Sequence, residues 1–269
     1  MPHGVSEGRG QAPIVENKAP LADSVFSPGA LLHQARRQKG LPAADVPPIC
    51  ILDPDGDIVR HLRRSGAAEP FLPWPCYHTE LDTFALAGRT VGIVGCAVGA
   101  PFAVLVAEQL FASGCRLLLS VTSAGQIVAT QSPPYFIVIS RALRDEGTSY
   151  HYADAAEFAD ADPRLVALAA AASTGQGPAR LVGPTWTTDA PFRETAGAIA
   201  WARAKGALAV EMEAAALYAF ARARGVRILC LAHVTNTMGR AERDFEKGEA
   251  DGTAEALSVL ASIIAAIES

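Results

Sequence analysis

The feature that most constrains the fold is an alternation, from Pro48 onward, of short apolar runs with longer segments of helical pattern. Short apolar runs bounded by turn residues are typical of buried strands, and strands that alternate with helices predict an α/β fold. The expected strands are 49–52, 90–94, 116–121, 135–139, 208–210 and 226–234. The expected helices are 102–113, 163–172, 214–224 and 252–267. We therefore expect a single α/β domain over residues 48–269.

Two segments precede this domain. Residues 1–24 are rich in Gly, Pro and polar residues and lack periodicity, which is typical of a disordered extension. Ser27 and Pro28 then form a capped helix start, and Gly40 is placed to end that helix. We expect residues 25–47 to be a short helical lead-in.

Size, charge and cysteine content narrow the class of protein. The 269 residues, 50% of them hydrophobic, are enough to bury the core of one domain. The formal net charge is −5 and no Lys/Arg-rich run with interleaved aromatic residues occurs, which argues against a nucleic-acid partner and favours a small molecule. The five cysteines stand singly, without disulfide or metal-ligand spacing. We expect reduced thiols, no metal site and no bound cofactor.

Two patterns bear on where the protein is expected to act: a secretory signal and a membrane-spanning segment. Residues 1–18 lack the apolar stretch of about 7–15 residues that a secretory signal requires. No later segment reaches the roughly 18 uninterrupted apolar residues of a membrane-spanning helix. We expect a cytoplasmic protein without a membrane partner.

A glycine-spaced turn, residues 95–101, lies between an expected strand and an expected helix. Backbone N–H groups at such a helix start can bind an anion, so Gly99 is a candidate for a phosphate or water pocket. A dinucleotide-binding loop is one alternative, but the spacing of Gly92, Gly95 and Gly99 does not match G-x-G-x-x-G, and no acid ends the next strand. Tight packing of strand on helix is the other interpretation of these glycines.

The sequence Glu211-Met212-Glu213 lies where an expected strand runs directly into a helix. The helix dipole favours carboxylates at such a start even when they have no function. The functional interpretation is a carboxylate that accepts hydrogen bonds from the vicinal hydroxyls of a ribose, while Met212 packs beneath the sugar. Charge-assisted hydrogen bonds of this kind are stronger than neutral ones and can fix the orientation of a sugar.

Together these motifs resemble the nucleoside phosphorylase family, the group of uridine phosphorylases, hexameric purine nucleoside phosphorylases and nucleosidases. The resemblance covers residues 48–267 and rests on the blocks 94–101, 120–125, 187–189 with 192–194, and 210–215. It implies a single-domain three-layer fold with a mixed central sheet flanked by helices, and a homo-oligomer. The implied activity is cleavage of the N-glycosidic bond of a nucleoside. The family default is uridine-phosphorylase-like phosphorolysis, with inorganic phosphate as co-substrate and ribose 1-phosphate as product.

The resemblance also implies roles for individual residues. Glu213 would bind the ribose hydroxyls, Met212 would line the sugar, and Glu211 would support both. Phe192 and Arg193 fall where the family contacts the base, and a solvent-facing loop is the alternative for these two residues.

The region expected to hold phosphate departs from the family pattern. Phosphorylases of this group place arginines after the first strand, at the start of the block 120–125 and, from a neighbouring subunit, before the second strand. The matching positions here are 53–58, Ser120 and 78–80, and none of them is arginine. A guanidinium is a bidentate, permanently charged match for phosphate, so these changes predict weak phosphate binding unless Arg60 reaches in.

Nucleosidases of the family use an acid near the end of the first strand to position water. Asp55 and Asp57 lie close to that place, so hydrolysis with one of them as general base is the alternative to phosphorolysis. Ordinary turn chemistry is the other interpretation of both residues. Gly56 and Ser123 complete the expected pocket for phosphate or water. A non-catalytic nucleoside-binding protein is the third alternative.

Two further residues are candidates by position. Asn236 aligns with a position where purine-cleaving relatives use Asp to protonate the base. An amide can donate a hydrogen bond but no proton, so activation by a carboxylic acid at this position is not expected. His78 is a candidate for a contact across a subunit interface, although a lone histidine is more often structural.

Overall fold

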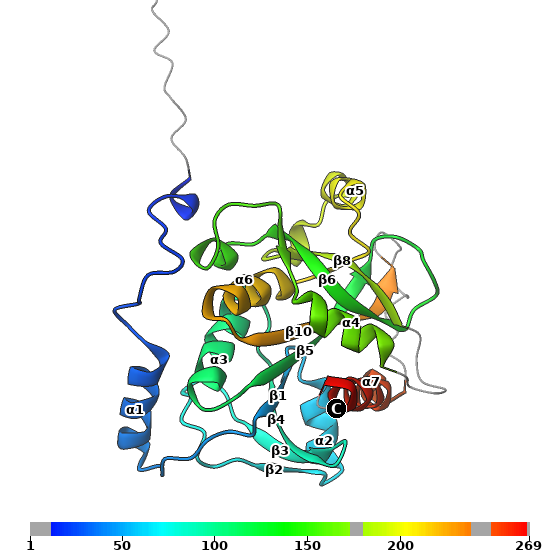
Figure 1. Ribbon diagram of the computed structural model, residues 1–269. Coiled ribbons are helices and arrows are strands. Elements are labelled where there is room, and N and C mark those ends of the chain that lie inside the picture. Colours follow the sequence, from blue (N-terminus) through cyan, green and yellow to red (C-terminus); the bar gives the residue numbers. More distant parts are fainter. Residues whose placement is uncertain (1–11, 173–179, 238–248, 268–269) are drawn as a thin grey trace, which may run out of the picture.

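The computed structural model describes residues 12–172, 180–237 and 249–267 (Figure 1). The strands are β1 (Ile49–Asp53), β2 (Ala68–Pro70), β3 (Asp82–Leu86), β4 (Arg89–Gly95), β5 (Leu117–Gln126), β6 (Tyr135–Asp145), β7 (Phe158–Asp160), β8 (Arg180–Thr188), β9 (Ala209–Glu211) and β10 (Arg227–Thr237). The α-helices are α1 (Pro28–Lys39), α2 (Asp57–Arg64), α3 (Ala100–Ala112), α4 (Pro163–Ala171), α5 (Ala196–Ala204), α6 (Ala214–Arg224) and α7 (Thr253–Ile267). Short 3-10 helices are η1 (Pro13–Val15), η2 (Thr148–His151), η3 (Pro191–Arg193) and η4 (Glu249–Gly252). No helix in these ranges is long and apolar enough to cross a membrane.

One mixed sheet contains all the strands of the described ranges. Their order is β10-β6-β8-β9-β5-β1-β4-β3-β2, with β7 paired to β6. β10 also pairs with β5, which closes β5, β10, β6, β8 and β9 into a ring. β5 is parallel to β1 and to β10, and its last residues, Gly125 and Gln126, pair antiparallel with β9. The carboxyl ends of β1, β5 and β10 therefore lie beside the short strand that leads into Glu213.

Helices cover both faces of the sheet. α3 and α6 pack on one face, where Leu110 and Phe220 belong to one core cluster. α2, α4 and α7 pack on the other face, where Leu62 and Ile263 belong to a second cluster. Figure 1 shows α3 and α6 on one side of the central strands and α2 and α7 on the other. Strands buried on both faces are apolar at successive positions, which explains why the central strands are continuous apolar runs rather than alternating ones.

The predicted fold class, a mixed central sheet flanked by helices, is confirmed. Each predicted strand and helix is present, and several strands run further at their carboxyl ends than the apolar runs indicated. The lead-in helix α1 begins at Ser27, whose side chain accepts a hydrogen bond from Ala30 N at 3.2 Å, and ends at Gly40 in the left-handed conformation. Within the predicted extension, residues 1–11 lie outside the described ranges and Pro13–Val15 form η1.

The sequence analysis missed several elements, and α2 and β8 bear most on the site. α2 begins at Asp57, the last residue of a stretch whose composition indicates a turn. Its apolar residues are few: Ile58, Val59 and Leu62 are the buried ones. β8 contains Gly183 and Pro184, which weaken a strand pattern. Pairing with β6 and β9 on its two sides holds β8 in the sheet despite this composition.

Gly95, at the end of β4, has no side chain, which permits α2 to pack closely against β4. Substitution of Gly95 tests this packing. A Cβ at Gly95 would lie 3.0 Å from Val59 Cγ2 and 3.3 Å from Gly56 Cα. We expect Gly95→Ala to lower the free energy of unfolding by about 1–3 kcal/mol, the usual cost of overpacking. Urea denaturation would measure this change.

The matched control is Gly197→Ala in α5, where the nearest atom to an added Cβ is 3.9 Å away. It is expected to be neutral or stabilising, because alanine is a better helix former than glycine. Equal stability of the two variants would contradict this account of the β4–α2 contact.

Candidate active site

Carboxylates from two separate parts of the chain gather at the carboxyl end of β5. Asp53 is the last residue of β1 and precedes Asp55, while Glu211 is the last residue of β9 and precedes Glu213. β1 lies on one side of β5, and β9 pairs with the end of the same strand. In α/β sheets, ligands bind outside the carboxyl ends of the strands, so this edge is the candidate site.

Glu213 is a buried side chain that reaches the glycine-rich turn. Its Oε1 accepts a hydrogen bond from Gly99 N at 2.7 Å, and its Oε2 lies 3.3 Å from Met212 N. Gly99 has a φ of 90°, which favours glycine at this position. Burial, reinforced by the charge of Glu211, raises the pKa of Glu213 to about 8, while the hydrogen bond from Thr122 acts in the opposite direction.

Glu211 is also buried, but its carboxylate is engaged entirely by the protein. Its Oε1 accepts hydrogen bonds from the hydroxyls of Thr185, at 3.1 Å, and Thr187, at 2.5 Å. Its Oε2 accepts from the backbone N–H groups of Glu213 and Ala214, both at 2.7 Å. Burial raises the pKa of Glu211, and these hydrogen bonds oppose that rise. Glu211 therefore connects β8 to the first turn of α6.

Asp53 organises the turn between β1 and α2. Its two carboxylate oxygens accept hydrogen bonds from Gly56 N at 3.1 Å and from Val59 N at 2.9 Å. Burial raises the pKa of Asp53 to about 7. Gly56 has a φ of 76°, and a Cβ there would lie 2.5 Å from Cys96 Sγ, so glycine is required both by the backbone and by the neighbouring thiol.

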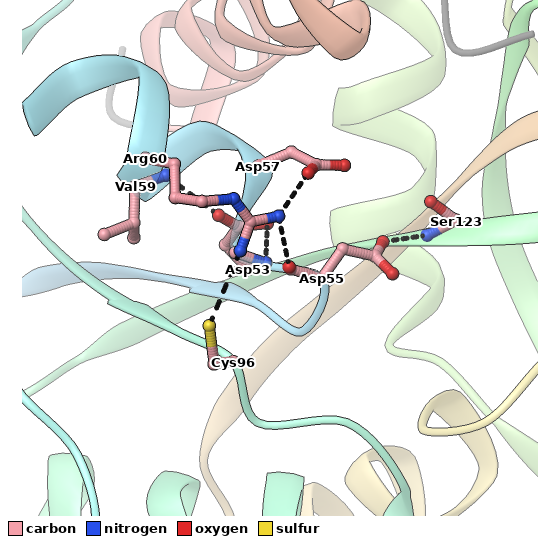
Figure 2. A network of polar contacts seen from close by, with 8 residues as sticks. Asp53, Asp55, Asp57, Val59, Arg60, Cys96 and Ser123 are labelled. Carbon is pink, nitrogen blue, oxygen red and sulfur yellow. Dashed lines mark hydrogen bonds and ion pairs between the residues drawn. The ribbon is translucent and has the colours of Figure 1, made fainter. Parts of the chain in front are cut away.

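Asp55 points from this turn toward β5 (Figure 2). Its Oδ2 accepts a hydrogen bond from Ser123 N at 2.7 Å. The family resemblance predicts that Ser123 belongs to the pocket for phosphate or water. At the expected anion pocket, the backbone N–H of Ser123 therefore already donates to a carboxylate of the protein itself.

Asp57 and Arg60 form a salt bridge on the other side of the turn (Figure 2). Arg60 Nη2 also donates to Asp55 O at 2.9 Å, and Arg60 Nη1 lies 3.8 Å from Cys96 Sγ. Asp55 and Asp57, predicted as equivalent candidates, thus have different surroundings: Asp55 is bonded to β5 and Asp57 to an arginine. The guanidinium of Arg60 is bound to groups of its own turn and is not directed at Ser123.

A small cavity of about 20 Å³ adjoins Asp55. Its lining includes Asp55, Asp57, Ser123 and His233. A single water needs roughly 10–15 Å³ of such space and a few polar partners, so the cavity suits one water. A larger cavity of about 580 Å³ lies between residues 19–22 and α6, and none of the site carboxylates lines it.

The remaining candidates lie around this centre. Asn236 pairs with Gly125 of β5 after an irregularity in β10, so it is next to the carboxyl end of β5. His78 is exposed, and its ring lies edge-on to Phe102 at 6.5 Å between centroids, near the start of α3. Phe192 and Arg193 form part of η3 beyond β8, and both are exposed, Phe192 by 99%. Their contact with a base stays a prediction.

Several residues of the site were not predicted as candidates. Asp53, Thr122, Thr185 and Thr187 are buried, and all four bond to the site carboxylates or to the turn that carries them. The spacing of Thr185 and Thr187 was an available signal, because alternate residues of a strand face the same side. Their partner could not be read from the sequence, since Glu211 lies on another strand.

The mixed sheet flanked by helices defines an α/β protein, and the buried acids where its strands end define the candidate site. The family model of the phosphorylase superfamily matches residues 48–267. The chain belongs to the phosphorylase superfamily.

Individual relatives agree with this assignment. The chain is 28% identical over 140 residues to the guanosine phosphorylase of Halorubrum lacusprofundi, a match that covers 52% of this chain and 58% of that protein, less than two thirds of its length. It is 29% identical over 182 residues to the DeoD-type purine nucleoside phosphorylase of Geobacillus kaustophilus, which covers 65% and 77% of the two chains.

Solved structures show the same fold at lower identity. A uridine phosphorylase from Vibrio fischeri ES114 superposes with a TM-score of 0.71 at 20% identity, covering 87% of this chain and 99% of that one. A purine nucleoside phosphorylase from Toxoplasma gondii superposes with a TM-score of 0.69 at 15% identity, covering 83% and 92%.

The raised pKa values of Asp53 and Glu213 predict how stability depends on pH. A carboxyl group whose pKa is higher in the folded protein binds more protons when folded, so stability falls as pH rises between its unfolded and folded values. For Asp53 this interval runs from 3.8 to about 7, and for Glu213 from 4.5 to about 8. We expect the Tm of the unliganded protein to fall as pH rises from about 5 to 8.

Glu213→Gln isolates one of the two groups, because the amide oxygen can still accept from Gly99 N but the side chain no longer titrates. The fall in Tm should be smaller in this variant, as followed by circular dichroism. Glu69→Gln in the exposed strand β2 is the control and should keep the slope of the original protein. An unchanged slope in Glu213→Gln would show that this carboxyl is ionised at neutral pH.

Proposed function

We propose that this protein cleaves the N-glycosidic bond of a nucleoside and that water, rather than phosphate, attacks the sugar carbon C1′. Membership of the phosphorylase superfamily supports the bond that is cleaved. The observation that carries the choice of nucleophile is the hydrogen bond from Ser123 N to the carboxylate of Asp55.

The sugar half of the site depends on Glu213. Its carboxyl is held by Gly99 N on one oxygen, and Met212, beside it, is half-buried. A buried carboxyl in this position can accept hydrogen bonds from the ribose hydroxyls and replace the water that those hydroxyls lose on binding. The raised pKa of Glu213 favours the protonated carboxyl in the empty site, which limits the cost of burying the acid.

The nucleophile half of the site favours water over phosphate. Phosphate would need N–H donors and positive charge, whereas Ser123 N already bonds to a carboxylate and Arg60 is paired with Asp57. An anion in this place would meet the charge of Asp55 at close range. Water fits the adjoining cavity and can donate a hydrogen bond to Asp55.

The reaction follows from these positions. As the C1′–N bond breaks, its electron pair leaves with the base and positive charge develops on the sugar, where nearby carboxylates stabilise it. The water oxygen bonds to C1′ and its proton passes to Asp55, which acts as general base. Asn236 would donate a hydrogen bond to the departing base, and Phe192 with Arg193 would contact it. The departing base takes up a proton from solvent, and Asp55 returns its proton to solvent, so the products are the free base and free ribose.

Phosphorolysis is the second candidate function. Sequence similarity to a guanosine phosphorylase and to a DeoD-type purine nucleoside phosphorylase favours this function. The two reactions differ in one product, since phosphorolysis gives ribose 1-phosphate.

A nucleoside panel assayed with and without phosphate separates these functions. We expect purified protein to release base from at least one purine or pyrimidine nucleoside, and the rate in phosphate-free buffer should equal the rate with phosphate. Release that requires phosphate would establish phosphorolysis instead. Binding of nucleosides without release of base from any panel member would indicate a non-catalytic nucleoside-binding protein.

Variants of Glu213 test the sugar contact. Glu213→Ala should lower kcat/KM by roughly 100-fold or more, because hydrogen bonds to a charged group contribute about 1.5–3 kcal/mol each. Steady-state kinetics would measure the loss. Glu69→Ala, in the exposed strand β2, is the control and should retain full activity. An unchanged kcat/KM in Glu213→Ala would show that this residue does not bind the sugar.

Variants of Asp55 test the nucleophile. Asp55→Asn should slow the phosphate-independent reaction by roughly 10²–10⁴-fold, the usual contribution of a general base. Asp55→Ser should lose this reaction too, but it frees Ser123 N for an anion, so added phosphate should partly restore base release. The sugar product identifies the nucleophile in each case. Full phosphate-independent activity in Asp55→Asn would contradict the role of Asp55.

A further inference from the structure

Glu211, predicted to support the residues that bind the sugar, is embedded in a hydrogen-bond network that joins β8 to the start of α6. The hydroxyl of Thr187 has two partners: it donates to Glu211 Oε1 and accepts from Ala215 N at 3.0 Å. Thr185 adds a second hydroxyl to the same carboxylate oxygen. The other oxygen receives the backbone N–H groups of Glu213 and Ala214.

We propose that Thr185, Thr187 and Glu211 form a positioning unit that fixes Glu213 for the sugar without themselves contacting the substrate. This inference rests on the proposed function of Glu213 as the ribose ligand. It adds Thr185 and Thr187 to the supporting role predicted for Glu211 and states which contacts provide that support.

Hydrogen-bond capacity is the first argument. An ionised carboxylate offers about four acceptor sites, two on each oxygen. Four donors occupy them in Glu211, namely two hydroxyls and two backbone N–H groups. The side chain is only 3% exposed. A sugar hydroxyl would have to displace one of these donors and leave it buried without a partner.

Backbone geometry is the second argument. The first turn of a helix leaves N–H groups without intrahelical partners, and α6 begins inside the protein where water cannot supply them. Glu211 and Thr187 satisfy those of Glu213, Ala214 and Ala215. Because Glu213 is the residue at the start of this helix, the same bonds that cap α6 determine where its side chain leaves the backbone.

Charge is the third argument. Burial raises the pKa of Glu211, the hydrogen bond from Thr187 opposes that rise, and the charge of Glu211 raises the pKa of Glu213. Asp55 raises it as well, and Thr122 lowers it, from the neighbouring strand ends. Removing the Thr187 hydroxyl should therefore let Glu211 take up a proton more readily, weaken its repulsion of Glu213 and lower the pKa of Glu213.

The test compares Thr187→Val, which keeps the shape of threonine but loses the hydroxyl, with Thr187→Ser, which keeps the hydroxyl. Thr185→Val is a second variant in case Thr187→Val fails to fold. Thr130→Val is the control, because its exposed hydroxyl bonds to Tyr135 rather than to a carboxylate. Steady-state kinetics would measure KM and kcat for the nucleoside. NMR would follow the ¹³C signal of the Glu213 carboxyl as a function of pH.

We expect Thr187→Val to raise KM by about tenfold, the effect of one hydrogen bond to a charged group, with a smaller change in kcat. The titration midpoint of Glu213 should move to lower pH, Thr187→Ser should restore both values, and Thr130→Val should change neither. A folded Thr187→Val or Thr185→Val protein with the KM and the Glu213 titration of the original would overturn the proposal.

The NMR titration of Glu213 needs no substrate, so it tests the positioning unit even in a protein without activity. An original protein that releases no base from any nucleoside would refute the proposed function, while the Glu213 titration would still decide whether the unit acts on Glu213. An active protein whose Thr187 variants titrate normally would refute the positioning unit alone.

Discussion

Burial of carboxylates at the ends of β1 and β9 is the constraint on which the rest of the site depends. An ionised carboxylate buried without partners is very unfavourable, so each of these acids must find donors within the protein. Asp53 and Glu211 find them at the starts of α2 and α6, where backbone N–H groups lack helical partners. The acids and the helix starts therefore stabilise each other.

This arrangement separates the acids that hold the two turns from the acids that the proposed function assigns to the substrate and the nucleophile. Asp53 and Glu211 each accept from two backbone N–H groups and fix the two turns. Asp55 and Glu213 extend from those turns toward β5 and the glycine-rich turn, each bonded to one strong backbone donor. In the proposed reaction Glu213 holds the sugar and Asp55 activates the nucleophile.

The sequence predicted the fold better than the site. Strands buried on both faces are continuous apolar runs, and these could be recognised locally, whereas α2 and β8 are held by their neighbours rather than by their own composition. Glu213 could be predicted because it stands at a junction of strand and helix. Its bond to Gly99 spans 114 residues, and that of Asp55 to Ser123 spans 68, so neither could be derived without the sheet order.

The origin of the oxygen that reaches the sugar tests the central claim most directly. The protein would be incubated with its best nucleoside and with phosphate in water labelled with heavy oxygen, and the sugar product would be examined by mass spectrometry after short times. Attack by water predicts free ribose that carries one labelled oxygen from the first turnovers, even in the presence of phosphate. Ribose 1-phosphate without the label would contradict the account.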